Sequence, residues 1–108
     1  MQYSEMSNEE LKTEMKQLQE HGQAAYDNEN WSEYEVQMTK WYLAKSYEIL
    51  PHVRLEIGKT YRIAEEYDRL TVTGLEGVMA WGMRESSGET VALPIAKLDE
   101  FDDGFDSP

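Results

Sequence analysis

The sequence contains no cysteine, which excludes disulfide bonds, thiolate nucleophiles and cysteine-ligated zinc and favours a reducing compartment. It also lacks any apolar run near the roughly 18 residues that span a bilayer. The first residues, MQYSEMSNEELKTEM, show no signal-peptide pattern. We therefore expect a cytoplasmic protein with no membrane partner, and its 108 residues correspond to about one domain.

Motifs that carry chemistry are missing as well. The two histidines, His21 and His52, stand in polar or connecting segments and form no HxxxH or HxH pair. No GxSxG, GxGxxG or P-loop motif occurs. The acidic end, DEFDDGFDSP, places Phe101 where a calcium loop needs an oxygen ligand. We therefore expect no catalytic residue, no metal and no cofactor, and a protein that is not an enzyme.

Basic side chains are scarce, with 10 against 22 acidic ones and a net charge of −12. A field of this sign opposes the approach of nucleic acid or an anionic membrane. Residues 40–62 alone have a positive balance, and their basic residues are Lys40, Lys45, Arg54, Lys59 and Arg62. We favour a solvated face, or a partner for the protein's own acids, over a phosphate site.

Residues 99–108 form an acidic tail with five acidic and no basic side chains. We expect this tail to be solvated and mobile. The alternative is a docking motif, or a strap across the protein's own basic segment, with Phe101 and Phe105 as its anchors.

A helical pattern fills the first half of the chain. Ser7 and Glu10 form a capping box, and Gly22 interrupts or weakens the helix that follows. The apolar residues at helical spacing are Leu11, Met15, Leu18, Ala25 and Tyr26. After the turn at 27–30, Asn30 or Ser32 caps a second helix, which ends before Pro51. So short a turn predicts an antiparallel helical hairpin.

After Pro51 the apolar period changes from helical to alternating, which predicts strands. Four short strands are expected, over residues 55–65, 69–75, 78–85 and 90–95. A meander of such strands hides both of its faces by curling into a small barrel.

The turn between the second and third strands sets which side chains form the core. If Glu76 and Gly77 are a two-residue loop, Val72 lies opposite Trp81. The core face then holds Leu70, Val72, Met79, Trp81 and Met83, and the opposite face holds the small residues Thr71, Thr73, Ala80 and Gly82. A three-residue loop with Gly77 in a bulge slips the register by one and exchanges the faces. We favour the first register because it groups bulky residues together.

Several segments resemble the YfhH family, small proteins of Gram-positive spore-forming bacteria. They are YSEMSNEEL, AKSYEILP, GKTYR, GVMAWGMRESS and ALPIAKL, and the match extends to about Leu98. The resemblance implies an α+β fold, with an N-terminal antiparallel helical hairpin (1–50) packed on a C-terminal SH3-like β-barrel (51–98) as one folding unit. In such barrels a strand ends at a proline, makes a 3₁₀ turn and re-enters with an apolar residue, and Leu93, Pro94 and Leu98 suit that route. Some members of the family are labelled transcriptional regulators.

A binding or regulatory protein that acts through protein–protein contacts is the function we expect. The candidate partner-binding residues are Tyr61, Arg62, Trp81 and Arg84, because tyrosine, tryptophan and arginine are common anchors of interfaces. The competing interpretation is structural, with Tyr61 and Trp81 in the core and Arg84 in an ion pair. The alternative function is a nucleic-acid-associated regulator that uses the barrel and segment 40–62. Surplus aromatic residues on the second helix also predict a homodimer through the helical hairpin.

Overall fold

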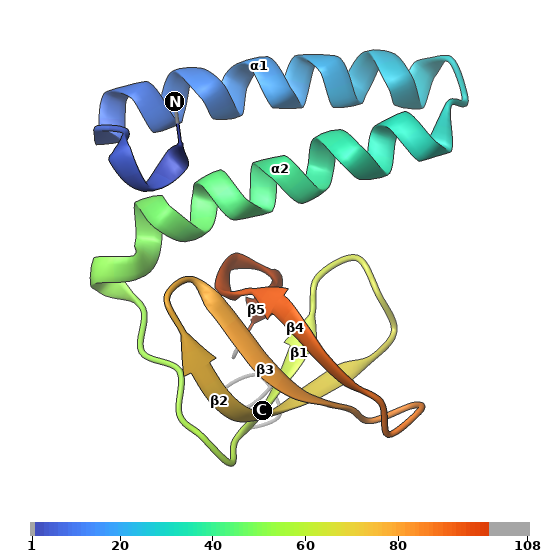
Figure 1. The fold of residues 1–108 in the computed structure, drawn as a ribbon. Helices are drawn as coiled ribbons and strands as arrows, with labels where there is room; N and C mark the ends of the chain where they lie inside the picture. The colour runs from blue at the N-terminus through green and yellow to red at the C-terminus, as the bar shows by residue number, and fades with distance from the viewer. Residues whose placement is uncertain (1, 100–108) are drawn as a thin grey trace, which may run out of the picture. The chain divides into compact units, whose positions relative to one another are not determined.

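The computed structural model describes residues 2–99, and residues 100–108, which include most of the expected acidic tail, lie outside the described part. The chain divides between Pro51 and His52 into two compact units. The fold is α+β, with two helices followed by a five-stranded antiparallel sheet (Figure 1). The helices are α1 (Asn8–Asp27) and α2 (Trp31–Ile49), with short 3₁₀ segments η1 (Tyr3–Glu5) and η2 (Leu50–His52). The strands are β1 (Thr60–Ile63), β2 (Arg69–Glu76), β3 (Met79–Arg84), β4 (Thr90–Pro94) and β5 (Leu98–Asp99), with η3 (Ile95–Lys97) before β5.

Helix α1 begins at the expected capping box. The Ser7 Oγ accepts a hydrogen bond from the Glu10 amide at 3.2 Å, and the Glu10 Oε1 accepts one from the Ser7 amide at 2.9 Å. The predicted interruption at Gly22 is wrong, because α1 continues through it to Asp27. A Cβ at Gly22 would lie 3.5 Å from the Met38 Sδ, so this small residue allows α2 to pack closely there.

The hairpin is confirmed, and its turn is a Schellman motif (Figure 1). The Asn30 amide donates to the Ala25 carbonyl at 2.8 Å, and the Glu29 amide donates to the Tyr26 carbonyl at 3.0 Å. Glu29 itself adopts a left-handed conformation with φ +57. Of the two caps considered for α2, Asn30 is the one used, since its side chain accepts from the Glu33 amide.

The sheet has the order β4-β3-β2-β1-β5 and is not closed, because β4 and β5 are its two edge strands. The first strand is shorter than expected, since Gly58 turns the chain with φ +94 before Thr60. The expected route from Pro94 through a 3₁₀ turn to a buried Leu98 is confirmed by η3 and β5.

The favoured register of β2 and β3 is wrong. Gly77 and Val78 form the loop, and Glu76 pairs with Met79. A bulge at Thr73 then brings Val72 opposite Gly82 instead of Trp81. The faces are exchanged as in the alternative register, although the bulge lies at Thr73 rather than at Gly77. The buried inner face of these two strands consists of Leu70, Val72, Ala80 and Gly82.

Glycines explain why this register is adopted. Gly77 occupies the first loop position and has φ +58, a left-handed conformation that favours glycine. In the predicted register, Glu76 would have held this first position. A Cβ at Gly82 would lie 2.3 Å from the Thr71 carbonyl oxygen and 2.8 Å from the Leu70 Cγ. Large side chains of β2 therefore fill the space that small residues of β3 leave, so bulk packs on small residues rather than on bulk.

We predict that Gly82→Ala destabilises the protein by about 1–3 kcal/mol or more, because the added methyl group meets backbone that cannot move away without breaking the strand pairing. Gly74→Ala is the matched control, since a Cβ there would meet only the Trp81 Cβ, at 4.0 Å. Urea unfolding of the two variants measures the difference. Equal free energies of unfolding for the two would contradict the close approach at Gly82.

Candidate functional site

The exchanged register brings Trp81 to the outer face of the sheet, which we define as the side opposite the buried Leu70 and Val72. The Trp81 side chain is 43% exposed and that of Met83 is 47% exposed. By the pairing of the strands, this outer face includes Thr60, Arg62, Arg69, Thr71, Gly74, Glu76, Met79, Trp81, Met83, Thr90, Ala92, Pro94 and Asp99. It thus carries an apolar centre on β3.

Small neighbours make Trp81 stand out from this surface. Its cross-strand partners are Gly74 on β2 and Ala92 on β4, neither of which carries a large side chain. The Trp81 carbonyl accepts a hydrogen bond from the Thr73 Oγ1 at 3.4 Å. The backbone of Trp81 is therefore paired on both sides, next to the bulge on β2 and in regular register with β4, and neither partner residue covers the ring.

Polar residues border the apolar centre on the side of β1 and β2. The hydroxyls of Thr60 and Thr71 lie 2.8 Å apart. Arg62 and Arg69 are paired across the two strands and are exposed, and an Arg62 Nη2 lies 3.4 Å from the Asp99 Oδ2. An apolar centre with a polar rim is the usual composition of a protein–protein interface.

Tyr61 does not belong to this surface. Its side chain is 0% exposed and lies on the inner face with Ile63. Its hydroxyl accepts a hydrogen bond from the Glu56 amide at 2.9 Å. The structural interpretation therefore holds for Tyr61, whereas for Trp81 it is wrong.

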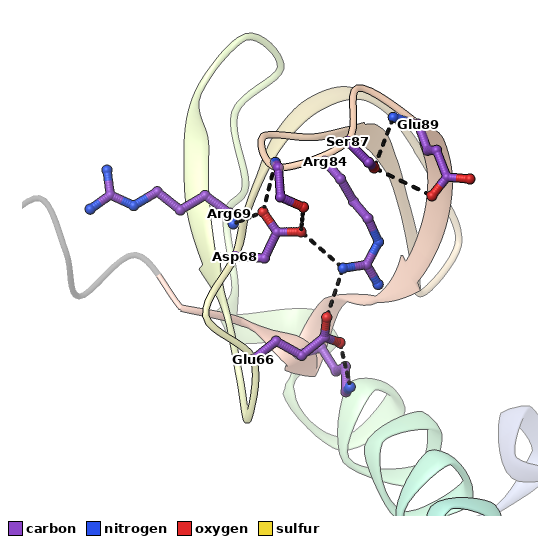
Figure 2. A network of polar contacts seen from close by, with 8 residues as sticks. Glu66, Asp68, Arg69, Arg84, Ser87 and Glu89 are labelled. Carbon is purple, nitrogen blue, oxygen red and sulfur yellow. Dashed lines mark hydrogen bonds and ion pairs between the residues drawn. The ribbon is translucent and has the colours of Figure 1, made fainter.

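Arg84 lies in a separate network of ion pairs at the end of β3, shown in Figure 2. Its Nη1 is 2.7 Å from the Glu66 Oε1 and 3.1 Å from the Asp68 Oδ2. Lys97 adds a second cation, 3.4 Å from the Glu66 Oε2. The Asp68 Oδ2 also accepts from the Ser86 Oγ at 2.8 Å. The network joins the β1–β2 loop, the β3–β4 turn and η3.

The side chains of this network stabilise one another's charged forms. Hydrogen bonds, first from the Ser86 hydroxyl and then from the Arg69 amide and the Arg84 guanidinium, lower the pKa of Asp68 to about 2. The hydrogen bond with Arg84 likewise lowers the pKa of Glu66, and in return Glu66 and Asp68 raise the pKa of Arg84. Arg84 is thus engaged by two carboxylates, which supports its structural role over partner binding.

The sequence patterns led us to place Met83 in the core with other bulky residues of β3, whereas it is exposed. They did not indicate Glu66 and Asp68 as partners of Arg84. The signal for the outward face was Gly82, because a residue without a side chain there allows β2 to approach β3 closely.

Neither metal-binding clusters nor membrane spans are found among residues 2–99. No group of three or more histidine, aspartate or glutamate side chains in this part is arranged to hold a metal ion. None of its helices is both long and apolar enough to cross a bilayer.

The Asp68 network gives a prediction for the pH dependence of stability. The folded pKa of about 2 lies below the ordinary 3.8, so the carboxylate stabilises the fold above pH 3.8 and loses this effect as the pH falls through about 2. The melting temperature of wild type should therefore exceed that of Asp68→Asn at neutral pH, and the gap should shrink between those two pH values. Glu85→Gln, which removes an exposed carboxylate outside the network, should show no such trend. A gap that stays constant with pH would contradict the ion-pair role.

Comparison with known proteins agrees with the expected resemblance. Residues 1–99 match the family model described as "Protein of unknown function (DUF1811)". The chain is also 38% identical, over 99 residues, to the protein described as "Uncharacterized protein YfhH" from Bacillus subtilis (strain 168). The matched region covers 91% of this chain and 94% of that protein. The chain belongs to the DUF1811 family, and its likeness to YfhH is confirmed.

Proposed function

We propose that this protein is a non-enzymatic, cytoplasmic binding or regulatory protein that acts through protein–protein contacts on the outer face of its sheet. The observation that carries the proposal is the exposure of Trp81 at the centre of β3. Tryptophan is among the commonest energetic anchors of interfaces, and a half-exposed tryptophan on a strand that is paired on both sides loses little further freedom when a partner binds.

The surroundings of Trp81 support a protein partner. Met83 and Met79 extend the apolar centre along β3, and methionine adapts readily to different partner surfaces. Ala92 leaves room beside the indole ring for a side chain of the partner. The arginines at the border, Arg62 and Arg69, supply polar contacts that fix orientation.

We further propose that the sheet is of the SH3-like barrel class. The strand order β4-β3-β2-β1-β5 supports this, as does the 3₁₀ segment between β4 and β5. Small barrels of this kind hold partners on a strand face while the fold stays unchanged.

A nucleic-acid-associated regulator ranks below a protein-binding one. Three of the five cations of segment 40–62 lie near carboxylates, with Lys45 at 2.8 Å from Glu48 and Lys59 at 4.0 Å from Glu56. The third is Arg62, beside Asp99. Cations held in this way release fewer counterions on binding phosphates, and the net charge of −12 adds to the penalty.

We predict that Trp81→Ala weakens partner binding by tenfold or more while lowering stability by no more than about 1 kcal/mol. To measure binding, a photo-crosslinking amino acid replaces Thr90, which lies on the outer face beside Met83, and the protein is crosslinked to its partner inside the cells that produce it. The yield of the crosslinked complex should fall by tenfold or more in Trp81→Ala, as expected for the loss of an interface anchor. Tyr67→Ala, which removes a fully exposed aromatic residue of the β1–β2 loop, is the matched control.

Two results would count against the proposal. A crosslink of equal strength in wild type and Trp81→Ala would show that the outer face does not use its tryptophan. A crosslinked species that disappears on nuclease treatment would favour the nucleic-acid alternative.

A further inference from the structure

A second group of aromatic residues lies at the end of the helical hairpin, where Tyr26 and Trp31 are exposed and Tyr34 is half-buried. Tyr26 comes from α1, and Trp31 and Tyr34 come from α2. The ring centroid of Tyr26 is 5.2 Å from that of Trp31 and 5.4 Å from that of Tyr34, both in edge-to-face geometry. Tyr26 is 52% exposed and Trp31 is 51% exposed. We call residues 26–35 the hairpin tip.

The cap and the turn at this place do not use the aromatic side chains, which contact one another across α1 and α2. Trp31 is the first residue of α2, where the Asn30 side chain already provides the cap. The Schellman turn is closed by backbone hydrogen bonds from Glu29 and Asn30, which use no side chain of the aromatic group. Exposed aromatic residues gathered in this way mark an interaction site.

Acidic residues outnumber basic ones around the hairpin tip. Residues 17–39 contain no lysine or arginine and one histidine, His21, and their carboxylates are Glu20, Asp27, Glu29, Glu33 and Glu35. All five of these acidic residues are exposed. This charge favours a cationic ligand and repels an anionic one.

Glu29 adds a carboxylate at a position that favours glycine. It occupies the C′ position of the Schellman motif with φ +57. The Cβ of any residue other than glycine strains the backbone at this position, and the carboxylate of Glu29 adds to the charge of the hairpin tip.

We propose that the hairpin tip binds an arginine-rich segment of a partner protein. The planar guanidinium stacks on the exposed faces of Tyr26 and Trp31, while the neighbouring carboxylates attract its charge. A second copy of this chain fits less well, because two tips of the same negative charge repel each other. The proposal concerns the helical unit and is independent of the outer face of the sheet.

The test uses the full chain and a peptide of nine arginines, with titration calorimetry as the readout. Wild type should bind this peptide, and Trp31→Ala and Tyr26→Ala should each weaken binding about 5- to 30-fold, as expected for the loss of a cation–π contact. Val36→Ala is the matched control, since it removes an exposed apolar side chain of α2 outside the hairpin tip and should leave affinity unchanged. A peptide of nine lysines should bind more weakly than the arginine peptide, because ammonium groups do not stack.

Glu29→Gly separates binding from folding. It should raise the melting temperature, since glycine adopts this conformation without strain. It should also weaken binding of the arginine peptide severalfold, because it removes a carboxylate from the hairpin tip. A variant that is more stable and yet binds less tightly cannot owe its weaker binding to unfolding.

Four results would overturn the proposal. The first is that Trp31→Ala binds the arginine peptide with wild-type affinity. The second is equal binding of the lysine and arginine peptides, which would indicate attraction by net charge alone. The third is a wild-type dimer in sedimentation equilibrium that Trp31→Ala dissociates, which would assign the hairpin tip to a second copy. The fourth is loss of peptide binding in Trp81→Ala but not in Trp31→Ala, which would move the peptide-binding site to the sheet.

Discussion

The close approach of β3 to β2 at Gly82 is the constraint on which the sheet depends. Because Gly82 has no side chain, the Thr71 carbonyl oxygen can lie only 2.3 Å from the place that a Cβ would occupy. Leu70 and Val72 can then cover β3 and become fully buried. Because strands alternate, a small residue held inward at position 82 requires the residue at 81 to face outward. The exposure of Trp81 thus follows from the packing of its neighbour.

Features set by nearby residues could be predicted from the sequence, whereas those set by pairing between strands could not. The Ser7 capping box, the end of the second helix before Pro51 and the 3₁₀ route after Pro94 each follow from local chemistry, and each is confirmed. The β2–β3 register depends on one residue in a turn, and a slip of one exchanges both faces. Grouping large residues together chose the wrong register, because in this sheet large residues pack on small ones. The partners of Arg84 were missed because Glu66 and Asp68 are 18 and 16 residues away in the chain.

The two units present surfaces of different chemistry. The outer face of the sheet has an apolar centre with arginines at its border, which suits a partner of mixed polarity. The hairpin tip combines exposed aromatic rings with carboxylates alone, which suits a cationic segment. The Arg84 network does neither, since its charges are satisfied within the sheet unit and serve to hold two loops and η3 together. We propose that these two surfaces bind different partners. Glu29, which with Glu65 is one of two non-glycine residues of positive φ in the described part of the chain, would contribute its charge to one of them.

The most direct test of this account is the pairing of β2 and β3 in solution. Val72 and Gly82 lie opposite each other as a non-hydrogen-bonded pair of the antiparallel sheet. The backbone groups of Val72 instead form hydrogen bonds with Gly58 and Lys59, on the other side of β2. Such pairs bring α-carbons closest together, so nuclear Overhauser spectroscopy should detect contact between the α-protons of Val72 and Gly82. An α-proton contact between Val72 and Trp81 instead would place the tryptophan in the core and contradict the outer face as a binding surface.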